Sequence, residues 1–379
     1  MKTTVHGGIP ATNNMLVWRL GFNVGDPVAL VVFPTESVLI VRDIEMERAR
    51  KHARADRVAC PADFEPQNGT GLSPDRELAT AQAAAECLRR ANTNLVYGDR
   101  SLPLIFAETI RAAGVNVALD PDWGVRERRQ KSEREIEALR SAQSVTEGAM
   151  RMACELVANA SAADDGVLQH DGEILSSERV RAAIDTWLLE RGFTNPGAIV
   201  AGGPVGADCH DRGHGALRTG EPVIIDIFPR DRATGYNGDC TRTVVHGEIS
   251  TELAAMHTAV LHAKAAATAA TKVGATGDAV HQATVAGLAE HGFAERRGGA
   301  APADAAALIH GTGHGIGLDV HEPILLDHGN RELLLGEAFT IEPGLYKTGL
   351  GGIRVEDMVI VTAEGCDNLN QLPEHLNWA

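Results

Sequence analysis

Residues 222–245 read PVIIDIFPRDRATGYNGDCTRTVV, two apolar runs joined by a loop. The β-branched residues of both runs predict strands, and the Pro, Asp and Gly residues between them predict a hairpin. Asp226 lies in the first run, and Asp239 directly precedes the second. Side chains that face each other across paired antiparallel strands project from the same face of the sheet, so we expect these two carboxylates to converge.

Two further acids lie in apolar, strand-like surroundings: Glu342 in AFTIEPG and Glu356 in GIRVEDMVIV. For a single such acid, a place at a strand end or an arginine partner is a sufficient explanation, because most acids stay exposed. Four acids that converge would raise one another's pKa unless a proton or a cation intervenes. Carboxylates with one imidazole suit Mn, Fe, Co or Zn, and two such metals that share bridging carboxylates support hydrolysis.

Three histidines crowd the glycine-rich stretch HGTGHGIGLDVHEP, residues 310–323. His310 and His314 are four positions apart, as in helical zinc enzymes. Glycine at every second position from 311 to 317 disfavours a helix, since each glycine costs about 1 kcal/mol relative to alanine. We therefore expect a non-helical segment in which the glycines let the backbone approach a substrate closely.

The length of 379 residues predicts two domains. The first part of the chain alternates short strands, such as VALVVFP and SVLIVR, with helices such as RELATAQAAAECLRRA, which indicates an α/β domain. The turn sequence DPDWG and the polar stretch VRERRQKSERE follow. These residues predict a linker, so we expect one domain over residues 1–125 and a second over 126–379.

The second domain is expected to mix helices with an antiparallel-looking sheet, an α+β fold. Ser132 and Glu135 form a capping-box pattern before a long amphipathic helix. Further helices are expected at about 174–191, 252–272 and 277–291. The expected strands are GAIVAG, PVIIDIF, TRTVVHG, AFTIEPG and RVEDMVIVT, and the alanine-rich residues 298–307 are expected to form an exposed loop.

The charge balance narrows the range of partners. Lys and Arg total 35 against 51 for Asp and Glu, and the net charge of −16 would repel nucleic acid and anionic lipid surfaces. Neither a signal-peptide pattern nor a membrane-spanning apolar run is found, so we expect a cytoplasmic protein with no membrane partner. Six cysteines without CxxC spacing predict buried free thiols instead of a zinc knuckle or disulfides.

Four motifs, in this order, resemble the pita-bread metallopeptidases, specifically their Xaa-Pro aminopeptidase and prolidase branch: DIFPRDRATGYNGDCTRT, HGTGHGIGLDVHE, TIEPGLY and GGIRVEDMVIVT. The resemblance extends from about residue 125 to the end. The residues before it resemble the family's smaller creatinase-like N-terminal domain in outline. The resemblance therefore implies an α+β pita-bread catalytic domain preceded by a creatinase-like α/β domain.

The resemblance also implies a site that binds two divalent metal ions, with Mn favoured and Co, Zn or Fe as alternatives. Asp239 and Glu356 are expected to bridge the metals, and a hydroxide between the metals to attack the amide carbonyl. Glu342 is expected to shuttle the proton. His321 would hydrogen-bond the carbonyl, and His210 would contact the leaving-group side. The implied metal ligands are Asp226, Asp239, His314, Glu342 and Glu356.

Four more residues match family positions around the ligands. Thr241, Thr340 and Arg354 are expected to orient ligands or carboxylates. His310 is expected to line the substrate or to support a ligand, and an ordinary structural histidine is the alternative.

Two departures from the family pattern concern the loops. Asp226 and Asp239 are 13 positions apart, which is longer than usual, but an even number of added residues leaves the facing of the side chains unchanged. The segment ADCHDRGHGAL adds Cys209 and His214 near the expected substrate entrance. A thiolate ligand is not expected, because thiolates suit softer metals.

The function expected from these features is a metal-dependent exopeptidase that hydrolyses an N-terminal peptide bond, an Xaa-Pro aminopeptidase or dipeptidase, as a homodimer. One alternative keeps the metals but acts as a hydrolase or lyase on a small non-peptide metabolite. Two others are a non-catalytic pita-bread binding module and a metal-free creatinase-type hydrolase. Both are disfavoured, since without metal the converging carboxylates only repel one another.

Overall fold

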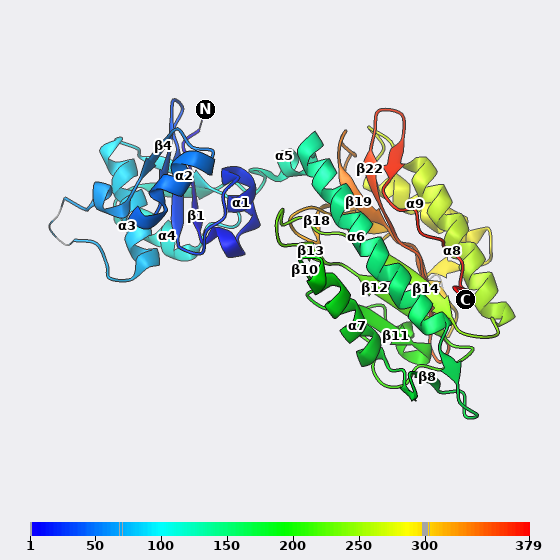
Figure 1. Cartoon of the computed structure of the whole chain (residues 1–379). Coiled ribbons are helices and arrows are strands. Elements are labelled where there is room, and N and C mark those ends of the chain that lie inside the picture. The colour runs from blue at the N-terminus through cyan, green and yellow to red at the C-terminus, as the bar shows by residue number, and fades with distance from the viewer. Residues whose placement is uncertain (1, 68, 70, 298–301, 303) are drawn as a thin grey trace. The chain divides into compact units, whose positions relative to one another are not determined.

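The chain divides into two units, Met1–Arg128 and Arg129–Ala379, which Figure 1 draws from blue to red. This computed structural model describes residues 2–67, 69, 71–297, 302 and 304–379. Half of the loop expected at residues 298–307 lies outside the described residues, and its last residue, Ala307, is buried in the strand Ala307–Leu308 instead of exposed.

The first unit is a mixed sheet between helices, in the strand order β4-β3-β2-β1-β5-β6. The two faces of strand β2 (Val28–Val32) pack into different cores. Ala29 and Val31 pack with helices α3 (Arg76–Arg90) and α4 (Leu104–Ala112), whereas Val28 and Leu30 pack with α1 (Asn14–Leu20) and α2 (Met46–His52). Successive side chains of a strand point to opposite faces, so an apolar run such as VALVV can serve both cores. The strands are β1 (Thr4–Gly8), β2 (Val28–Val32), β3 (Ser37–Ile40), β4 (Arg57–Ala59), β5 (Leu95–Gly98) and β6 (Asn116–Leu119); the helices are α1 (Asn14–Leu20), α2 (Met46–His52), α3 (Arg76–Arg90) and α4 (Leu104–Ala112), with α5 (Val125–Arg129) at the junction.

The second unit begins with its longest helix, α6 (Glu133–Ala158). The predicted capping box is confirmed: the Ser132 amide donates to Glu135 Oε2 at 2.8 Å. The other predicted helices are confirmed as α7 (Ser177–Glu190), α8 (Thr251–Ala270) and α9 (Gly277–Ala289). Helices α6 and α7 pack together over one sheet, and α8 and α9 pack together over the others (Figure 1).

Three of the five sheets in the described part of the second unit make up most of it. The sheet beneath α6 and α7 is β11 (Ile199–Gly202), β12 (Pro222–Ile227) and β14 (Cys240–Val245). The second has the order β18 (Glu322–Leu326), β17 (Gly313–Gly315), β19 (Ala338–Ile341), β22 (Asp357–Val361) and β23 (Cys366–Asn368). The third has the order β15 (Ala294–Glu295), β16 (Ala307–Leu308), β20 (Gly344–Lys347) and β21 (Gly351–Arg354). Smaller elements complete the unit: β7 (Ser161–Ala162), β8 (Leu168–His170), β9 (Glu173–Ile174), β10 (Phe193–Thr194), β13 (Arg230–Asp231) and the 3₁₀ helix η4 (Gly203–Ala207).

Two expected strands are divided in the structure. AFTIEPG separates into β19 and the start of β20, and RVEDMVIVT separates into the end of β21 and β22. Each break lies where the chain leaves one sheet and enters the other. Pro343 and Gly344 mark the first break in the sequence, but no local pattern shows that the chain changes sheet at either break.

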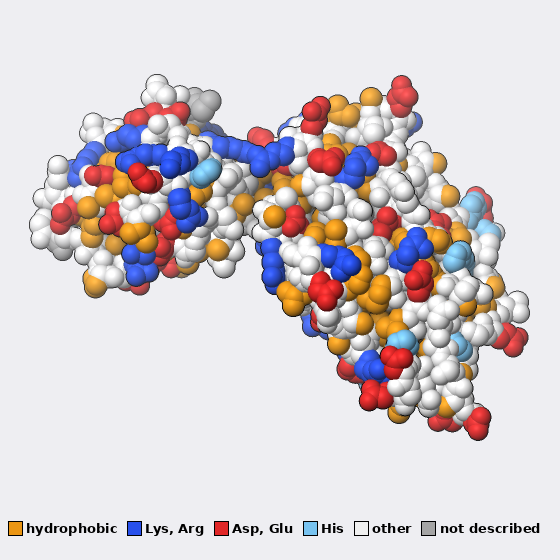
Figure 2. Space-filling model, in the orientation of Figure 1, with side chains coloured by type: hydrophobic (Ala, Val, Ile, Leu, Met, Phe, Trp, Pro, Cys, Tyr) orange, Lys and Arg blue, Asp and Glu red, His pale blue; other side chains and the backbone are white. Residues whose placement is uncertain are grey.

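Acidic and basic side chains alternate on the face drawn in Figure 2, with hydrophobic atoms between them. Within the described residues, none of the helices is both long and apolar enough to cross a membrane.

Candidate metal and peptide site

A cavity of about 420 Å³ in the second unit brings most of the predicted site residues together. Thr241 and Thr340 do not line it, and their hydroxyls contact acids of the site from behind. The predicted residues that line the cavity are His210, Asp226, Asp239, His310, His314, His321, Glu342, Arg354 and Glu356.

The hairpin carries its two acids on one face. Asp226 on β12 pairs with Thr241 on β14, and Asp239 lies two positions before Thr241. Because strand faces alternate with period two, both aspartates project to the same side, and both line the cavity. The expected convergence is therefore confirmed. The connecting loop forms β13, which pairs with β10, and its residue Arg230 bridges to Asn237, so the longer loop is held by backbone pairing of its own.

The donor atoms of three residues meet most closely. Asp239, His314 and Glu356 each offer one donor atom, and these atoms all lie within 4.8 Å of one another. His314 Nε2 lies 3.7 Å from Asp239 Oδ2 and 3.5 Å from Glu342 Oε1. This arrangement combines several hard oxygen donors with one imidazole, a set that suits divalent first-row metals.

Arg354 and Thr241 hold two of the acids from behind. Arg354 Nη2 donates to Asp226 Oδ2 at 2.7 Å, and Arg354 Nε donates to Thr241 Oγ1 at 3.2 Å. The Thr241 hydroxyl in turn donates to Glu356 Oε2 at 2.7 Å. The orientation of Asp226 and Glu356 is thus fixed by one connected network.

Thr340 contacts two more of the predicted ligands, Glu342 and His314. Its hydroxyl donates to Glu342 Oε1 at 3.4 Å and accepts from the backbone amide of His314 at 3.2 Å. One threonine side chain on β19 therefore links the backbone that carries the imidazole to the carboxylate beside it.

The acids of the site carry more negative charge than the protein neutralises. Burial and the neighbouring carboxylates raise the pKa of Asp239 and of Glu356 well above the usual range, and burial raises the pKa of Glu342 to about 7. Asp226 Oδ1 is buried and has no hydrogen-bond partner among the described residues. A buried oxygen without a donor is costly, and a bound cation would satisfy it. The residues present therefore fit a cation site.

His310 is fully engaged by protein groups. Arg354 Nη1 donates to the Tyr346 hydroxyl at 2.8 Å, and that hydroxyl lies 2.8 Å from His310 Nε2. His310 Nδ1 lies 2.7 Å from the carbonyl oxygen of Gly311. Burial lowers the pKa of His310 to about 3, which agrees with a neutral ring that accepts from Tyr346 and donates to Gly311. The geometry favours a supporting role over a metal ligand.

The two remaining histidines are open to the cavity. The ring of His321 lies 4.2 Å from that of His314, centroid to centroid, in an edge-on arrangement. Burial and the neighbouring His210 lower the pKa of His321, so its ring is neutral near pH 7. His210 is exposed and lies on the segment after η4.

The glycines of the 310–323 stretch lie against the protein's own backbone. The segment forms strand β17, so the expected absence of a helix is confirmed. A Cβ at Gly313 would lie 1.9 Å from the carbonyl oxygen of Thr340, and one at Gly315 would lie 2.7 Å from that of Glu322. Gly311 and Gly313 also line the cavity. The glycines thus permit close packing of β17 between its neighbours, and their expected approach to a substrate stays a prediction.

Sequence reasoning did not single out Gln143 on α6. Its side chain donates to the Asp239 carbonyl oxygen at 2.6 Å and accepts from the Asp239 amide at 2.9 Å. It also donates to Asn370 Oδ1 at 2.9 Å, which accepts from the Met358 amide. A buried polar residue on the core face of a predicted helix is the signal that could have identified it.

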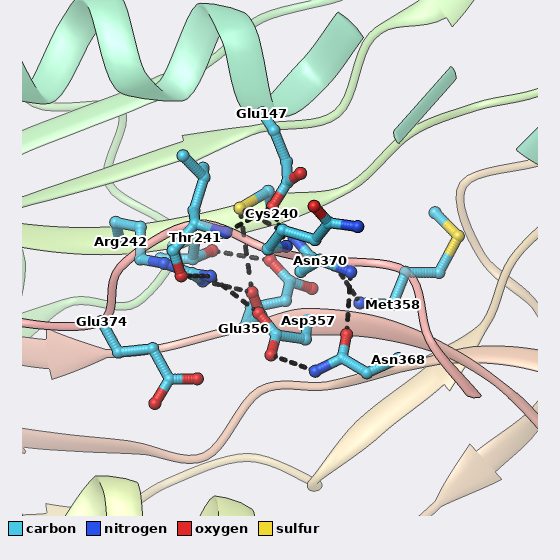
Figure 3. Close-up of polar contacts among 12 residues, drawn as sticks. Glu147, Cys240, Thr241, Arg242, Glu356, Asp357, Met358, Asn368, Asn370 and Glu374 are labelled. Atoms are coloured by element: carbon cyan, nitrogen blue, oxygen red, sulfur yellow. Dashed lines mark hydrogen bonds and ion pairs between the residues drawn. The ribbon is translucent and has the colours of Figure 1, made fainter. Parts of the chain in front are cut away.

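A second group of charged residues contacts the backbone of Glu356 (Figure 3). Arg242 Nη1 donates to the Glu356 carbonyl oxygen at 2.6 Å, and Arg242 Nη2 donates to Asp357 Oδ1 at 2.8 Å. Asp357 also accepts from Asn368 Nδ2 at 2.7 Å and pairs with Lys264. Although burial opposes it, these cations hold the pKa of Asp357 below its usual range.

A second group of possible ligands lies beside the cavity wall: His281, Glu295 and His328. Here a guanidinium already supplies the cation. Arg297 donates to Glu295 Oε1 at 2.7 Å and to both carboxylate oxygens of Asp327, at 2.8 and 3.0 Å. This group is therefore an ion-pair network in which one guanidinium serves two carboxylates.

Residues 137–363 match the sequence family described as metallopeptidase family M24. The chain belongs to this family. It is 36% identical over 275 residues to the "Probable dipeptidase PepE" of Mycobacterium tuberculosis, and the match covers 70% of this chain and 64% of that protein. It is 30% identical over 231 residues to the "Xaa-Pro dipeptidase" of Pyrococcus furiosus, over 59% of this chain and 61% of that protein.

Solved structures share the fold over nearly the whole chain. The dipeptidase PepE from Mycobacterium ulcerans is 27% identical with a TM-score of 0.75, and the match covers 99% of this chain and 92% of that one. The Xaa-Pro dipeptidase from Bacillus anthracis has a TM-score of 0.80 at 23% identity, over 98% of this chain and 94% of that one. The fold is thus the α+β pita-bread fold with its N-terminal domain.

Proposed function

We propose that this chain is a metal-dependent exopeptidase that hydrolyses the N-terminal peptide bond of dipeptides or short peptides, with proline after the scissile bond. The observation that carries the proposal is the convergence of the Asp239, His314 and Glu356 donor atoms within 4.8 Å, beside the unpartnered Asp226 Oδ1. Family membership and the dipeptidase names of the relatives support it.

Two divalent cations would lower the pKa of an attacking water and polarise the peptide carbonyl. Manganese is our first choice, because carboxylates with a single imidazole form a hard donor set. The side chains that would hold the cations are Asp226, Asp239, His314, Glu342 and Glu356.

Glu342 is assigned the proton transfer. Its carboxylate lines the cavity, with Oε1 3.5 Å from His314 Nε2, so it lies where a proton of the attacking water can be taken up and released. It would take the proton of the attacking water and deliver it to the leaving nitrogen. Its contact with Thr340 holds the carboxylate in place for both transfers.

His321 and His210 are assigned to the substrate. A neutral His321 keeps one N–H, which would donate to the carbonyl oxygen as negative charge develops on it. His210, exposed on the same cavity, would contact the leaving-group side. Arg354, Thr241 and Thr340 would hold the acids without touching the substrate.

The test is hydrolysis of Xaa-Pro dipeptides and Xaa-Pro-Xaa tripeptides by the chain loaded with Mn, Co or Zn. We expect release of the N-terminal residue, and loss of the activity on chelation. Release no greater than in the chelated control would contradict the proposal. Turnover of a non-peptide C–N compound in place of the peptides would favour the alternative of a small-metabolite hydrolase or lyase.

A homodimer and a cytoplasmic location are part of the same proposal: the first rests on the resemblance, and the second is the expectation drawn from the sequence. Light scattering on the purified chain tests the first, and fractionation of the source cells tests the second.

A further inference from the structure

Arg212 lies on the cavity wall, in a segment whose backbone is firmly held. The Val200 amide on β11 donates to the Arg212 carbonyl oxygen at 3.1 Å. Arg181 on α7 donates to the same oxygen and, at 2.9 Å, to that of Gly213. These bonds fix the point from which the Arg212 side chain projects.

The guanidinium of Arg212 packs on Gly197, which also lines the cavity. A Cβ at Gly197 would lie 2.8 Å from Arg212 Cζ and 2.9 Å from both terminal nitrogens. Gly197 has φ +147°, a conformation that side chains rarely adopt. Any larger residue at position 197 would displace the guanidinium, so the two residues form a matched pair.

The donors of Arg212 remain available. Within the part of the chain that the structure describes, no side chain accepts a hydrogen bond or an ion pair from its guanidinium. The other arginine that lines the cavity, Arg354, is committed to Asp226, Thr241 and Tyr346. Arg212 is therefore the cation on this wall that can accept a new anion.

The chemistry of a guanidinium selects the ligand. Its planar fork binds a carboxylate through two parallel hydrogen bonds. His210, which we assign to the leaving-group side, lies two residues before Arg212 on the same segment. A dipeptide extends only about 3.5 Å per residue beyond the scissile bond, so its carboxylate would stay within reach of this wall.

We propose that Arg212 binds the free C-terminal carboxylate of a dipeptide and so makes dipeptides the preferred substrates over longer or C-terminally blocked peptides. This inference rests on the proposed function. A longer peptide or an amide would place a neutral group at Arg212 and lose the ion pair.

The experiment compares Ala-Pro with Ala-Pro amide on the metal-loaded chain. Wild-type protein should have a KM about five- to tenfold lower for the acid, since the ion pair is partly exposed to solvent. In Arg212→Ala the two substrates should have equal KM with kcat unchanged, and Arg212→Lys should restore part of the difference. Arg232→Ala removes an exposed arginine that does not line the cavity and should behave as wild type. An unchanged preference in Arg212→Ala would overturn the inference.

Failure of the proposed function has a different signature. If the metal-loaded wild type hydrolyses neither peptide, calorimetric titration with Ala-Pro and its amide still tests the carboxylate site. Tighter binding of the acid, lost in Arg212→Ala, would support the site without the hydrolase. Equal or undetectable binding of the two ligands would refute it.

Discussion

Glu342 and Glu356 occupy equivalent positions at two neighbouring crossings between the same pair of sheets. Glu342 follows β19 and precedes β20, whereas Glu356 follows β21 and precedes β22. Strands β19 and β22 pair in one sheet, and β20 and β21 pair in the other. Both glutamates thus lie where the chain passes between the sheets, and both line the cavity.

At both crossings the backbone amide of the glutamate donates to a carbonyl oxygen of another segment. The Glu342 amide donates to the Thr312 carbonyl oxygen at 2.7 Å, and the Glu356 amide donates to that of Thr241 on β14 at 3.1 Å. The second bond ties the crossing to the sheet that carries Asp226. Rigid backbone bonds are what a metal centre needs, because they hold the carboxylates together before a cation binds.

The first prediction concerns metal content. His314→Ala removes the imidazole whose Nε2 lies beside Asp239 and Glu342. We expect elemental analysis to give about two divalent ions per wild-type chain. The variant should hold fewer ions, with a loss of hydrolysis of more than about 100-fold. His262→Ala, a histidine on α8 that does not line the cavity, should keep both properties. Full metal content in His314→Ala would remove this residue from the ligand set.

The second prediction concerns pH and the metal-free protein. Burial raises the pKa of Glu342 from its ordinary value of 4.5 to about 7. A raised folded-state pKa contributes stability below pH 4.5 that is lost as the pH rises through about 7. Glu342→Gln removes this loss, so the variant should gain stability relative to wild type between pH 5 and 8, by up to about 3 kcal/mol.

Urea denaturation of chelator-treated protein at both pH values measures the change. The exposed Glu364→Gln serves as the control and should show no such gain. A constant difference between Glu342→Gln and wild type across this pH range would mean that Glu342 does not titrate there.

Part of this site could be predicted from the sequence, because strand periodicity depends only on neighbouring residues. The apolar runs and the loop between them were sufficient to predict that Asp226 and Asp239 share a face, and Ser132 with Glu135 marked the start of α6. Period two and the capping pattern depend on neighbouring residues, so both can be read without the tertiary structure.

Other features depend on contacts between distant segments. The crossings at Glu342 and Glu356 lie within stretches that the sequence predicts as single strands, and the clamp of Gln143 on Asp239 joins residues 96 positions apart. Arg212 lines the cavity only because its segment folds back onto β11. No local pattern encodes these pairings, so they required the structure.

The third prediction tests the Gln143 clamp. Gln143→Leu would leave the Asp239 amide and carbonyl oxygen without their partners in a buried site. Each unsatisfied buried group costs about 1–3 kcal/mol, and a disturbed supporting residue lowers metal affinity by about 10- to 100-fold. Gln143→Glu keeps the acceptor for the amide and should lie between wild type and Gln143→Leu. Metal titration of the three proteins checks the order, and wild-type affinity in Gln143→Leu would show that the clamp does not position Asp239.

The fourth prediction tests the packing of β17. A Cβ at Gly313 would lie 1.9 Å from the Thr340 carbonyl oxygen, on the strand that holds the Thr340 hydroxyl against the His314 amide. Since backbone must move to relieve such a contact, Gly313→Ala should destabilise the chain by about 1–3 kcal/mol and weaken metal binding through His314. Gly365→Ala is the matched control, because its nearest atom would be 4.0 Å away. Thermal unfolding and metal titration should separate the two variants. If Gly313→Ala bound metal as tightly as Gly365→Ala, the close approach of β17 to β19 would not be needed to hold the imidazole.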